Sequence, residues 1–218
     1  MASLIYVADP LCSWCYGFGP QLTRLLQGLP DVPLDIVVGG LRAYNAEILD
    51  QPARDRLREH WQHVAAATGL AFNYDTLARP GLVCDTEPAC RAVVAARLLV
   101  PPGTERHPVL DVFHAIQHAF YAEGREVVDG TALADIACAT LHQRGIGITS
   151  ATFYANWSSE ATIAATRDEF IQTQRWGISG FPTLVLERNG RLDLVSSGFA
   201  RTEVLVERMQ ELLDKVPA

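Results

Sequence analysis

Two cysteines separated by two residues, Cys12 and Cys15, are the part of the sequence whose type and spacing point most directly to chemistry. Such a pair can close into a disulfide and open again, because one thiolate attacks a substrate disulfide and the second thiol resolves the mixed product. The same C-x2-C spacing is also half of many zinc sites. The neighbouring sequence has to decide between these two chemistries.

The segments on either side of the pair favour redox chemistry. Residues 3–8 form a short apolar run that ends at Asp9 and Pro10, which is typical of a buried strand, and the residues after the pair carry leucines at helical spacing. Cys12 then lies at a helix N-terminus, where free backbone N–H groups and the helix dipole stabilise a thiolate. We predict that Cys12 is the nucleophile and that Cys15 is the less exposed, resolving thiol.

The other three cysteines do not complete a zinc site of the usual pattern. Cys84 and Cys90 are separated by five residues, which is wider than a common zinc knuckle, and they are open to two interpretations: a second redox pair or two separate small buried side chains. Cys138 lies on an apolar helix face and is expected in the core. We predict no metal, and we interpret His60 with His63 and His114 with His118 as solvated helix faces.

The elements that must position the pair form an α/β pattern interrupted by helices. A second strand at 33–38 completes a strand–helix–strand unit with a right-handed crossover and a parallel pair. The sequence predicts one domain built from 1–44 and 160–218 and an inserted helical domain over 45–159. The remaining predicted elements are helices near 50–68, 87–99, 107–121, 131–143 and 160–176, strands at 183–186 and 192–195, and a closing helix with Val204, Leu205, Met209, Leu212 and Leu213 on one stripe.

A second motif, Gly180-Phe181-Pro182-Thr183, directly precedes the strand predicted at 183–186. A proline at the first residue of a strand cannot donate a hydrogen bond to the sheet. A cis Phe181–Pro182 bond would leave the neighbouring backbone free to pair with an extended peptide, whereas the alternative is a proline that only begins the strand.

Taken together, the strand, the C-x2-C pair at a helix start and the distant Gly-Phe-Pro-Thr before a hairpin and closing helix resemble the thioredoxin superfamily. The helical insertion resembles the DsbA branch, and within it the cytosolic proteins predicted to be protein disulfide isomerases, including the FrnE type. The chain is also similar to 2-hydroxychromene-2-carboxylate isomerases and kappa-class glutathione transferases. The resemblance implies a thioredoxin fold with a large all-helical domain inserted between its two halves.

The resemblance also implies roles for individual residues. Cys12 is the nucleophile, Cys15 the resolving thiol and Pro182 a cis-proline that faces the disulfide. The backbone of Phe181 would bind an extended substrate peptide by strand addition, and we include Trp14 and Thr183 in the substrate-binding set. Phe181 departs from the smaller residue usual in periplasmic DsbA proteins, so its bulk affects the expected substrate range.

The residues around the pair are expected to set its redox potential. Ser13-Trp14 replaces the Pro-His dipeptide of strong periplasmic oxidants, which removes one cation beside the thiolate. We therefore expect a couple less oxidising than the roughly −120 mV of DsbA. Asp9 joins Ser13 and Trp14 as a residue that modulates the thiols, either as a proton acceptor for Cys15 or, in the interpretation we favour, as the turn residue before the proline. Trp14 and Tyr16 are predicted to line a substrate groove.

The sequence predicts a cytoplasmic protein disulfide isomerase or reductase. Its substrates would be protein or peptide disulfides, its only cofactor the redox-active cysteine pair, and its reducing partner glutathione or a thioredoxin system. The alternatives are a glutathione-dependent isomerase or transferase acting on a small aromatic substrate, whose relatives usually carry serine at the position of Cys12, and a non-enzymatic binding module. A net charge of −7 without a basic cluster argues against nucleic-acid partners, and no apolar stretch predicts a membrane partner or export.

Overall fold

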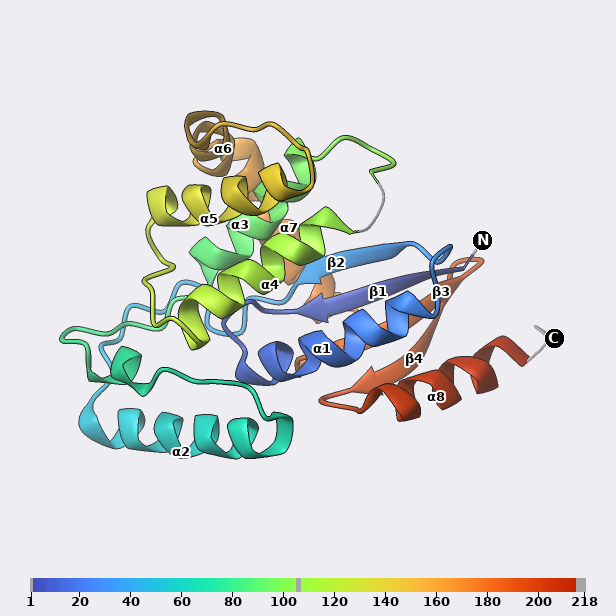
Figure 1. Cartoon of the computed structure of the whole chain (residues 1–218), viewed down its shortest axis with the longest axis horizontal. Coiled ribbons are helices and arrows are strands. Elements are labelled where there is room, and N and C mark those ends of the chain that lie inside the picture. Colours follow the sequence, from blue (N-terminus) through green and yellow to red (C-terminus); the bar gives the residue numbers. More distant parts are fainter. Residues whose placement is uncertain (1, 105–106, 215–218) are drawn as a thin grey trace.

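The computed structural model describes residues 2–104 and 107–214, and its centre is a four-stranded mixed sheet (Figure 1). The strands run in the order β2-β1-β3-β4, with β1 parallel to β2 and antiparallel to β3, and with β3 antiparallel to β4. Their bounds are Ala2–Ala8 for β1, Leu34–Val38 for β2, Thr183–Arg188 for β3 and Arg191–Ser197 for β4. Pairing of β1 with β3 therefore joins the two ends of the chain.

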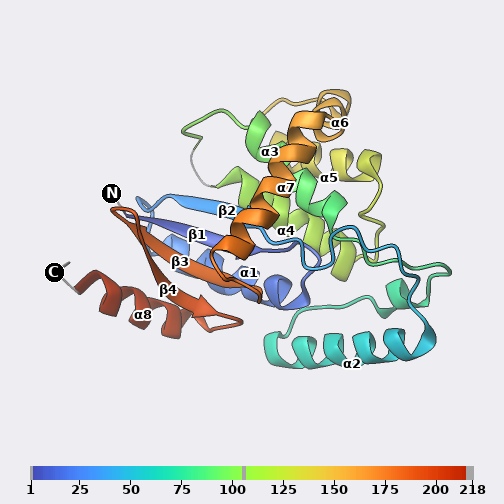
Figure 2. The same cartoon turned by 180° about the vertical axis from the view of Figure 1, so that it is seen from behind.

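Helices cover both faces of this sheet. On one face lies α1 (Ser13–Gln27), where the Tyr6 ring of β1 stacks on Phe18 at 5.7 Å, and α8 (Thr202–Asp214) packs beside it against β4. On the other face, α7 (Glu160–Arg175) crosses β2 (Figure 2). The Glu169 carboxylate of α7 accepts the Val38 N–H at 2.8 Å, so a side chain satisfies part of the outer edge of β2.

The helical block between the two halves is centred on α3, which packs against α4, α5, α6 and α7. Its core consists of fully buried aliphatic and aromatic side chains such as Val93, Phe113 and Leu133. Aromatic rings around Trp61 connect α2 to α4, with Tyr121 at 5.1 Å. The helices are α2 (Gln51–Thr68), α3 (Glu87–Leu99), α4 (Pro108–Tyr121), α5 (Gly130–Gln143) and α6 (Ser150–Trp157), with a 3-10 helix at Tyr74–Ala78.

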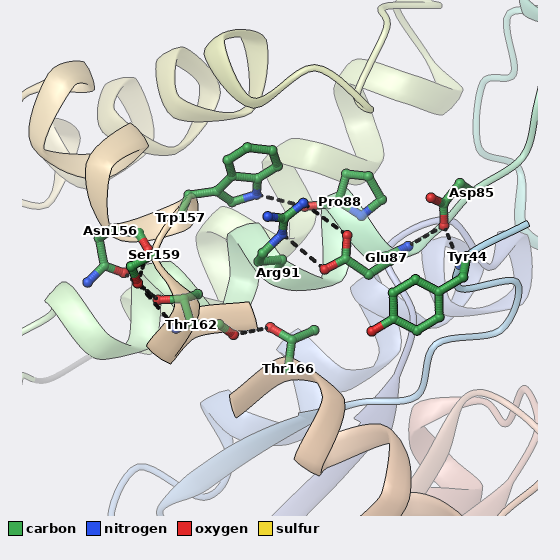
Figure 3. Close-up of polar contacts among 10 residues, drawn as sticks. All are labelled: Tyr44, Asp85, Glu87, Pro88, Arg91, Asn156, Trp157, Ser159, Thr162 and Thr166. Carbon is green, nitrogen blue, oxygen red and sulfur yellow. Dashed lines mark hydrogen bonds and ion pairs between the residues drawn. The ribbon is translucent and has the colours of Figure 1, made fainter. Parts of the chain in front are cut away.

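Polar contacts bind the first turn of α3 to α6 (Figure 3). Arg91 forms an ion pair with Glu87 at 3.0 Å, and the two side chains are only 14% and 7% exposed. The Arg91 guanidinium lies 3.8 Å from the centre of the Trp157 ring, while the Trp157 indole N–H donates to the Pro88 carbonyl at 3.0 Å. The ion pair lies within α3, and the two contacts of Trp157, with the Arg91 guanidinium and the Pro88 carbonyl, are those that join α3 to α6.

The predicted strands, the parallel β1–β2 pair and the thioredoxin fold with a helical insertion are confirmed. The sequence missed α6 because only two of its eight residues, Phe153 and Trp157, are buried, which leaves little periodic signal. The stripe predicted for the closing helix was too wide. Val204 and Leu213 are 56% and 48% exposed, because α8 buries a single narrow row against β4 and α1. No described helix is long and apolar enough to cross a membrane.

Candidate redox site

Cys12 and Cys15 lie at the junction between β1 and α1. The strand ends at Ala8, and a turn in which the Cys12 N–H donates to the Asp9 carbonyl at 3.0 Å delivers Cys12 to the N-cap position of α1. Cys12 is 7% exposed and Cys15, one turn into the helix, is fully buried. The two thiols therefore occupy the positions expected of an attacking and a resolving cysteine.

The surroundings push the acidities of the two thiols in opposite directions. The pKa of Cys12 is lowered, chiefly by a hydrogen bond from the Cys15 thiol and further by the backbone N–H groups of Cys15 and Trp14, against burial and the charge of Asp9. The pKa of Cys15 is raised well above its usual range by burial and then by Cys12. When the pair is reduced, negative charge consequently gathers on Cys12 while Cys15 keeps its proton.

The segment before β3 faces the nucleophile. The Phe181–Pro182 peptide bond is cis, and the Cys12 thiol donates to the Phe181 carbonyl at 3.6 Å. The neighbouring Pro182 carbonyl already accepts the Gly198 N–H at 2.7 Å, and the Thr183 hydroxyl donates to the Gly180 carbonyl at 2.8 Å. Thr183 is buried, so its side chain supports the turn, while the Phe181 carbonyl is the group directed at Cys12.

The Phe181 ring lies against the backbone at the end of β2. A Cβ atom added at Gly39 would stand 2.1 Å from the ring Cζ, so only glycine leaves room for this approach. Sequence reasoning did not assign Gly39 to the site, although a Gly-Gly pair directly after a strand marks a place where another group can approach the backbone closely.

Asp9 is fully buried beneath the two thiols. Its carboxylate accepts the N–H groups of Leu11 at 2.8 Å and Leu41 at 2.6 Å, and the Cys90 thiol at 3.5 Å. Burial raises the pKa of Asp9, whereas the Thr86 side chain and these three hydrogen bonds oppose the rise. Asp9 therefore orders the turn, as predicted, and is at the same time a titratable group close to the redox pair.

The aromatic neighbours of the thiols separate into two environments. Trp14 is partly exposed and contacts His60 and His63 of α2 and Phe199 after β4, with ring centres 6.2, 5.6 and 5.6 Å away. Tyr16 instead stacks on Tyr121 at 5.0 Å inside the aromatic core. The groove position predicted for Tyr16 was wrong, because the helix turns this ring toward the inserted block.

A cavity of about 340 Å³ opens beside Cys12, between α1 and the helical block. Ser13 and Cys84 line it together with Cys12. Its charged residues are Arg42, Arg79 and Glu126, and it is also lined by His60, whose pKa is lowered by burial. Cys84 and Cys90 are both free thiols. Cys84 lines this cavity, whereas the Cys90 thiol donates a hydrogen bond to Asp9. Sequence reasoning missed the cavity because its walls come from segments that carry no motif of their own.

The histidine pairs are also separated by the fold. His60 and His63 are exposed, but His114 packs against Gly19 with a buried Nε2, and burial lowers its pKa to about 4. The solvated face predicted for His114 was therefore wrong, because α4 turns this side chain toward α1. In residues 2–104 and 107–214, no three His, Cys, Asp or Glu side chains are grouped so that they could hold a metal ion.

A comparison against protein families agrees with the fold. The family model of the DSBA-like thioredoxin domain matches residues 3–210. The chain belongs to this family. A search of curated protein sequences gave no significant match.

Among solved structures, the DsbA-like chain is similar to a candidate protein disulfide isomerase from Nitrosomonas europaea, with a TM-score of 0.86, 30% identity and 99% of each chain covered. It is also similar to the cytosolic disulfide reductase DsbM from Pseudomonas aeruginosa, with a TM-score of 0.75 and 27% identity over 97% of this chain and 98% of that one. DsbM has also been solved with GSH. A 2-hydroxychromene-2-carboxylate isomerase, at 14% identity, a TM-score of 0.61 and coverage of 96% and 95%, shares the fold alone.

Proposed function

We propose that this DsbA-like protein is a cytoplasmic thiol–disulfide oxidoreductase that reduces or isomerises disulfides in protein or peptide substrates. The observation that carries the proposal is the asymmetry of the pair: Cys12 is the more acidic thiol and lies 3.6 Å from the Phe181 carbonyl, while Cys15 is fully buried and less acidic. A cysteine with a stabilised thiolate beside a protonated partner is arranged for attack followed by release.

The reaction follows from this arrangement. The Cys12 thiolate attacks one sulfur of the substrate disulfide, forms a mixed disulfide and expels the other substrate sulfur as a thiolate. Cys15 then loses its proton and attacks Cys12 Sγ, which closes the Cys12–Cys15 disulfide and releases the second substrate thiolate. The substrate gains two electrons and the cysteine pair loses two. Two molecules of a thiol such as glutathione, or a reduced thioredoxin, would return the pair to the dithiol.

The charge of Asp9 favours the reducing direction. On balance the pKa of Cys12 is lowered, mainly by the hydrogen bond from Cys15, which stabilises the reduced pair, but the Asp9 charge raises this pKa. An anion near the thiolate disfavours the reduced form, so Asp9 makes the dithiol give up its electrons more readily than the hydrogen bonds alone would. The similarity to cytosolic DsbM, solved with GSH, supports the cytoplasmic location and glutathione as the reducing partner.

The cavity beside Cys12 favours a second candidate, a glutathione-dependent isomerase or transferase acting on a small aromatic molecule. Its volume of about 340 Å³ and its two arginines, Arg42 and Arg79, suit a small ligand with carboxylates next to an apolar group. Such an enzyme needs one reactive group at position 12, whereas dithiol exchange also needs Cys15. The two functions therefore differ in what they require of Cys15.

Reduction of insulin in a glutathione buffer tests the proposal. Wild-type protein is expected to accelerate the reduction, Cys12→Ser to abolish the acceleration, and Cys15→Ser to accumulate a mixed disulfide on Cys12 that mass spectrometry detects. The control is Cys138→Ser, which removes a buried thiol of α5 that lies outside the site. Full activity of Cys15→Ser on a small aromatic substrate, without insulin reduction by wild-type protein, would instead establish the second candidate.

A further inference from the structure

The buried Asp9 carboxylate receives hydrogen bonds from both parts of the molecule. The N–H groups of Leu11 and Leu41 come from the thioredoxin-like part. The third donor, the Cys90 thiol at 3.5 Å, comes from the first turn of α3 in the helical block, and the Thr86 side chain at the N-cap of the same helix also lowers the pKa of Asp9. Cys90 is fully buried and Thr86 is 2% exposed, so water does not compete with their interactions with Asp9.

The first turn of α3 is held firmly in this position. The Thr86 hydroxyl accepts the Arg42 N–H at 3.2 Å, and the Thr86 N–H donates to the Arg42 carbonyl at 3.4 Å. The Asp85 carboxylate accepts the N–H groups of Tyr44 and Glu87 at 2.8 and 3.0 Å (Figure 3). These hydrogen bonds join the backbone at Arg42–Tyr44 to the start of α3 next to Asp9, so Thr86 and Cys90 have little freedom to turn away from it.

The charge on Asp9 acts on the redox pair. Ionised Asp9 raises the pKa of both Cys12 and Cys15. A negative charge at this position disfavours the Cys12 thiolate of the reduced pair but has little effect on the neutral disulfide, so it makes the pair a stronger reductant. Among the described residues, the Cys90 thiol contacts the Asp9 carboxylate, and the charge of Asp9 also raises the pKa of the Tyr121 phenol.

We propose that Cys90, with Thr86 beside it, is a positioning residue for the redox reaction: the Cys90 hydrogen bond keeps a negative charge on Asp9 and so holds the Cys12–Cys15 pair at a reducing potential. Removing this donor favours the neutral carboxyl group, because a buried charge is costly without hydrogen bonds. The helical block thus tunes the chemistry as well as shaping the cavity. This inference rests on the proposed thiol–disulfide exchange.

The test measures the equilibrium constant for reduction of oxidised glutathione by the dithiol, through alkylation and mass spectrometry of the peptide that contains Cys12 and Cys15. Asp9→Asn is expected to lower this constant most. Cys90→Ala should lower it by about two- to tenfold, the range expected for one lost hydrogen bond. Cys90→Ser keeps a donor and should retain the wild-type value. Cys138→Ala, which removes another buried thiol, should have no effect.

A double-mutant cycle distinguishes an effect of Cys90 that acts through the charge of Asp9 from an effect of altered packing. In an Asp9→Asn background, Cys90→Ala should change the equilibrium constant no further, because the charge through which it acts is gone. A shift of equal size in both backgrounds, or no shift in folded Cys90→Ala protein, would overturn the proposal. If Cys90→Ala does not fold, Thr86→Val replaces it in the same cycle. Failure of wild-type Cys12 and Cys15 to exchange with glutathione at all would be recognised separately, as failure of the proposed function.

Discussion

Two helices, α1 and α3, begin within hydrogen-bonding distance of the same turn, yet their first turns are equipped differently. At the start of α1 stands Cys12, and the first turn contains no acidic residue, so its N–H groups are available to a thiolate. At the start of α3 stands Thr86, followed by Glu87 and Cys90, and this end faces the carboxylate of Asp9. Both helix termini favour a nearby anion. One terminus therefore serves the reacting thiolate, and the other faces a fixed carboxylate that opposes it.

Removal of the Cys12 thiolate at the start of α1 should have the largest effect. In Cys12→Ser, the hydroxyl is not ionised at neutral pH, so exchange with insulin should fall to the background rate of the glutathione buffer. Turbidity from precipitating insulin chains measures the rate. Retention of even a tenth of the wild-type acceleration would show that another thiol, such as the cavity-facing Cys84, carries the reaction.

Loss of the Arg91 side chain of α3 should lower the free energy of unfolding more than it lowers the rate of disulfide exchange. Arg91→Ala leaves Glu87 buried without its partner, so the free energy of unfolding should fall by about 3–5 kcal/mol, measured by urea denaturation. Arg91→Lys keeps the charge but loses the planar contact with Trp157, and should lie between Arg91→Ala and wild type. Equal stabilities of Arg91→Lys and Arg91→Ala would assign the effect to the stacking contact instead.

The contact of His114 in α4 with Gly19 in α1 should make the stability of the protein depend on pH. Burial lowers the pKa of His114 to about 4 in the folded protein, against about 6.5 for an exposed histidine. The unfolded chain therefore binds a proton first as the pH falls, and stability is lost between about pH 6.5 and 4, reaching roughly 2 kcal/mol at pH 5. His114→Gln should remove this part of the pH dependence in urea titrations at pH 8 and pH 5. If His114→Gln shows the same pH dependence of stability as wild type, the dependence does not come from His114.

The smallest expected effect concerns the segment that faces Cys12. In Gly39→Ala, the new methyl group collides with the Phe181 ring and should displace the Phe181 carbonyl from the nucleophile. We expect kcat/KM for insulin to fall by about tenfold, since a small misplacement of a reacting group costs up to a hundredfold. Adding Phe181→Ala should relieve the collision and recover most of the activity. If the double variant stays as slow as Gly39→Ala, the ring contact is not the cause.

Most of the fold could be predicted from local patterns. The β1–α1–β2 unit and the Asn189-Gly190 hairpin carry strong periodicity and turn signals, and the C-x2-C pair between strand and helix pointed to redox chemistry. The short helix α6 and the inward direction of His114 could not be predicted, because each depends on which neighbour packs against it. The hydrophobic pattern of a sequence shows where a helix lies and which of its faces is apolar, but not which neighbouring element packs against each face.

By itself, the sequence determined the reactive pair and the elements that carry it, because strand, turn and helix preferences act between residues that are close along the chain. Only the tertiary structure decided what surrounds the pair. Cys90 meets Asp9 across 81 positions of the sequence, and the cavity beside Cys12 draws its walls from several segments of the helical block. The hydrogen bonds that lower the pKa of Cys12 are local to the turn, but the burial that raises the pKa of both Cys12 and Cys15 depends on distance in space and is specified by no local pattern.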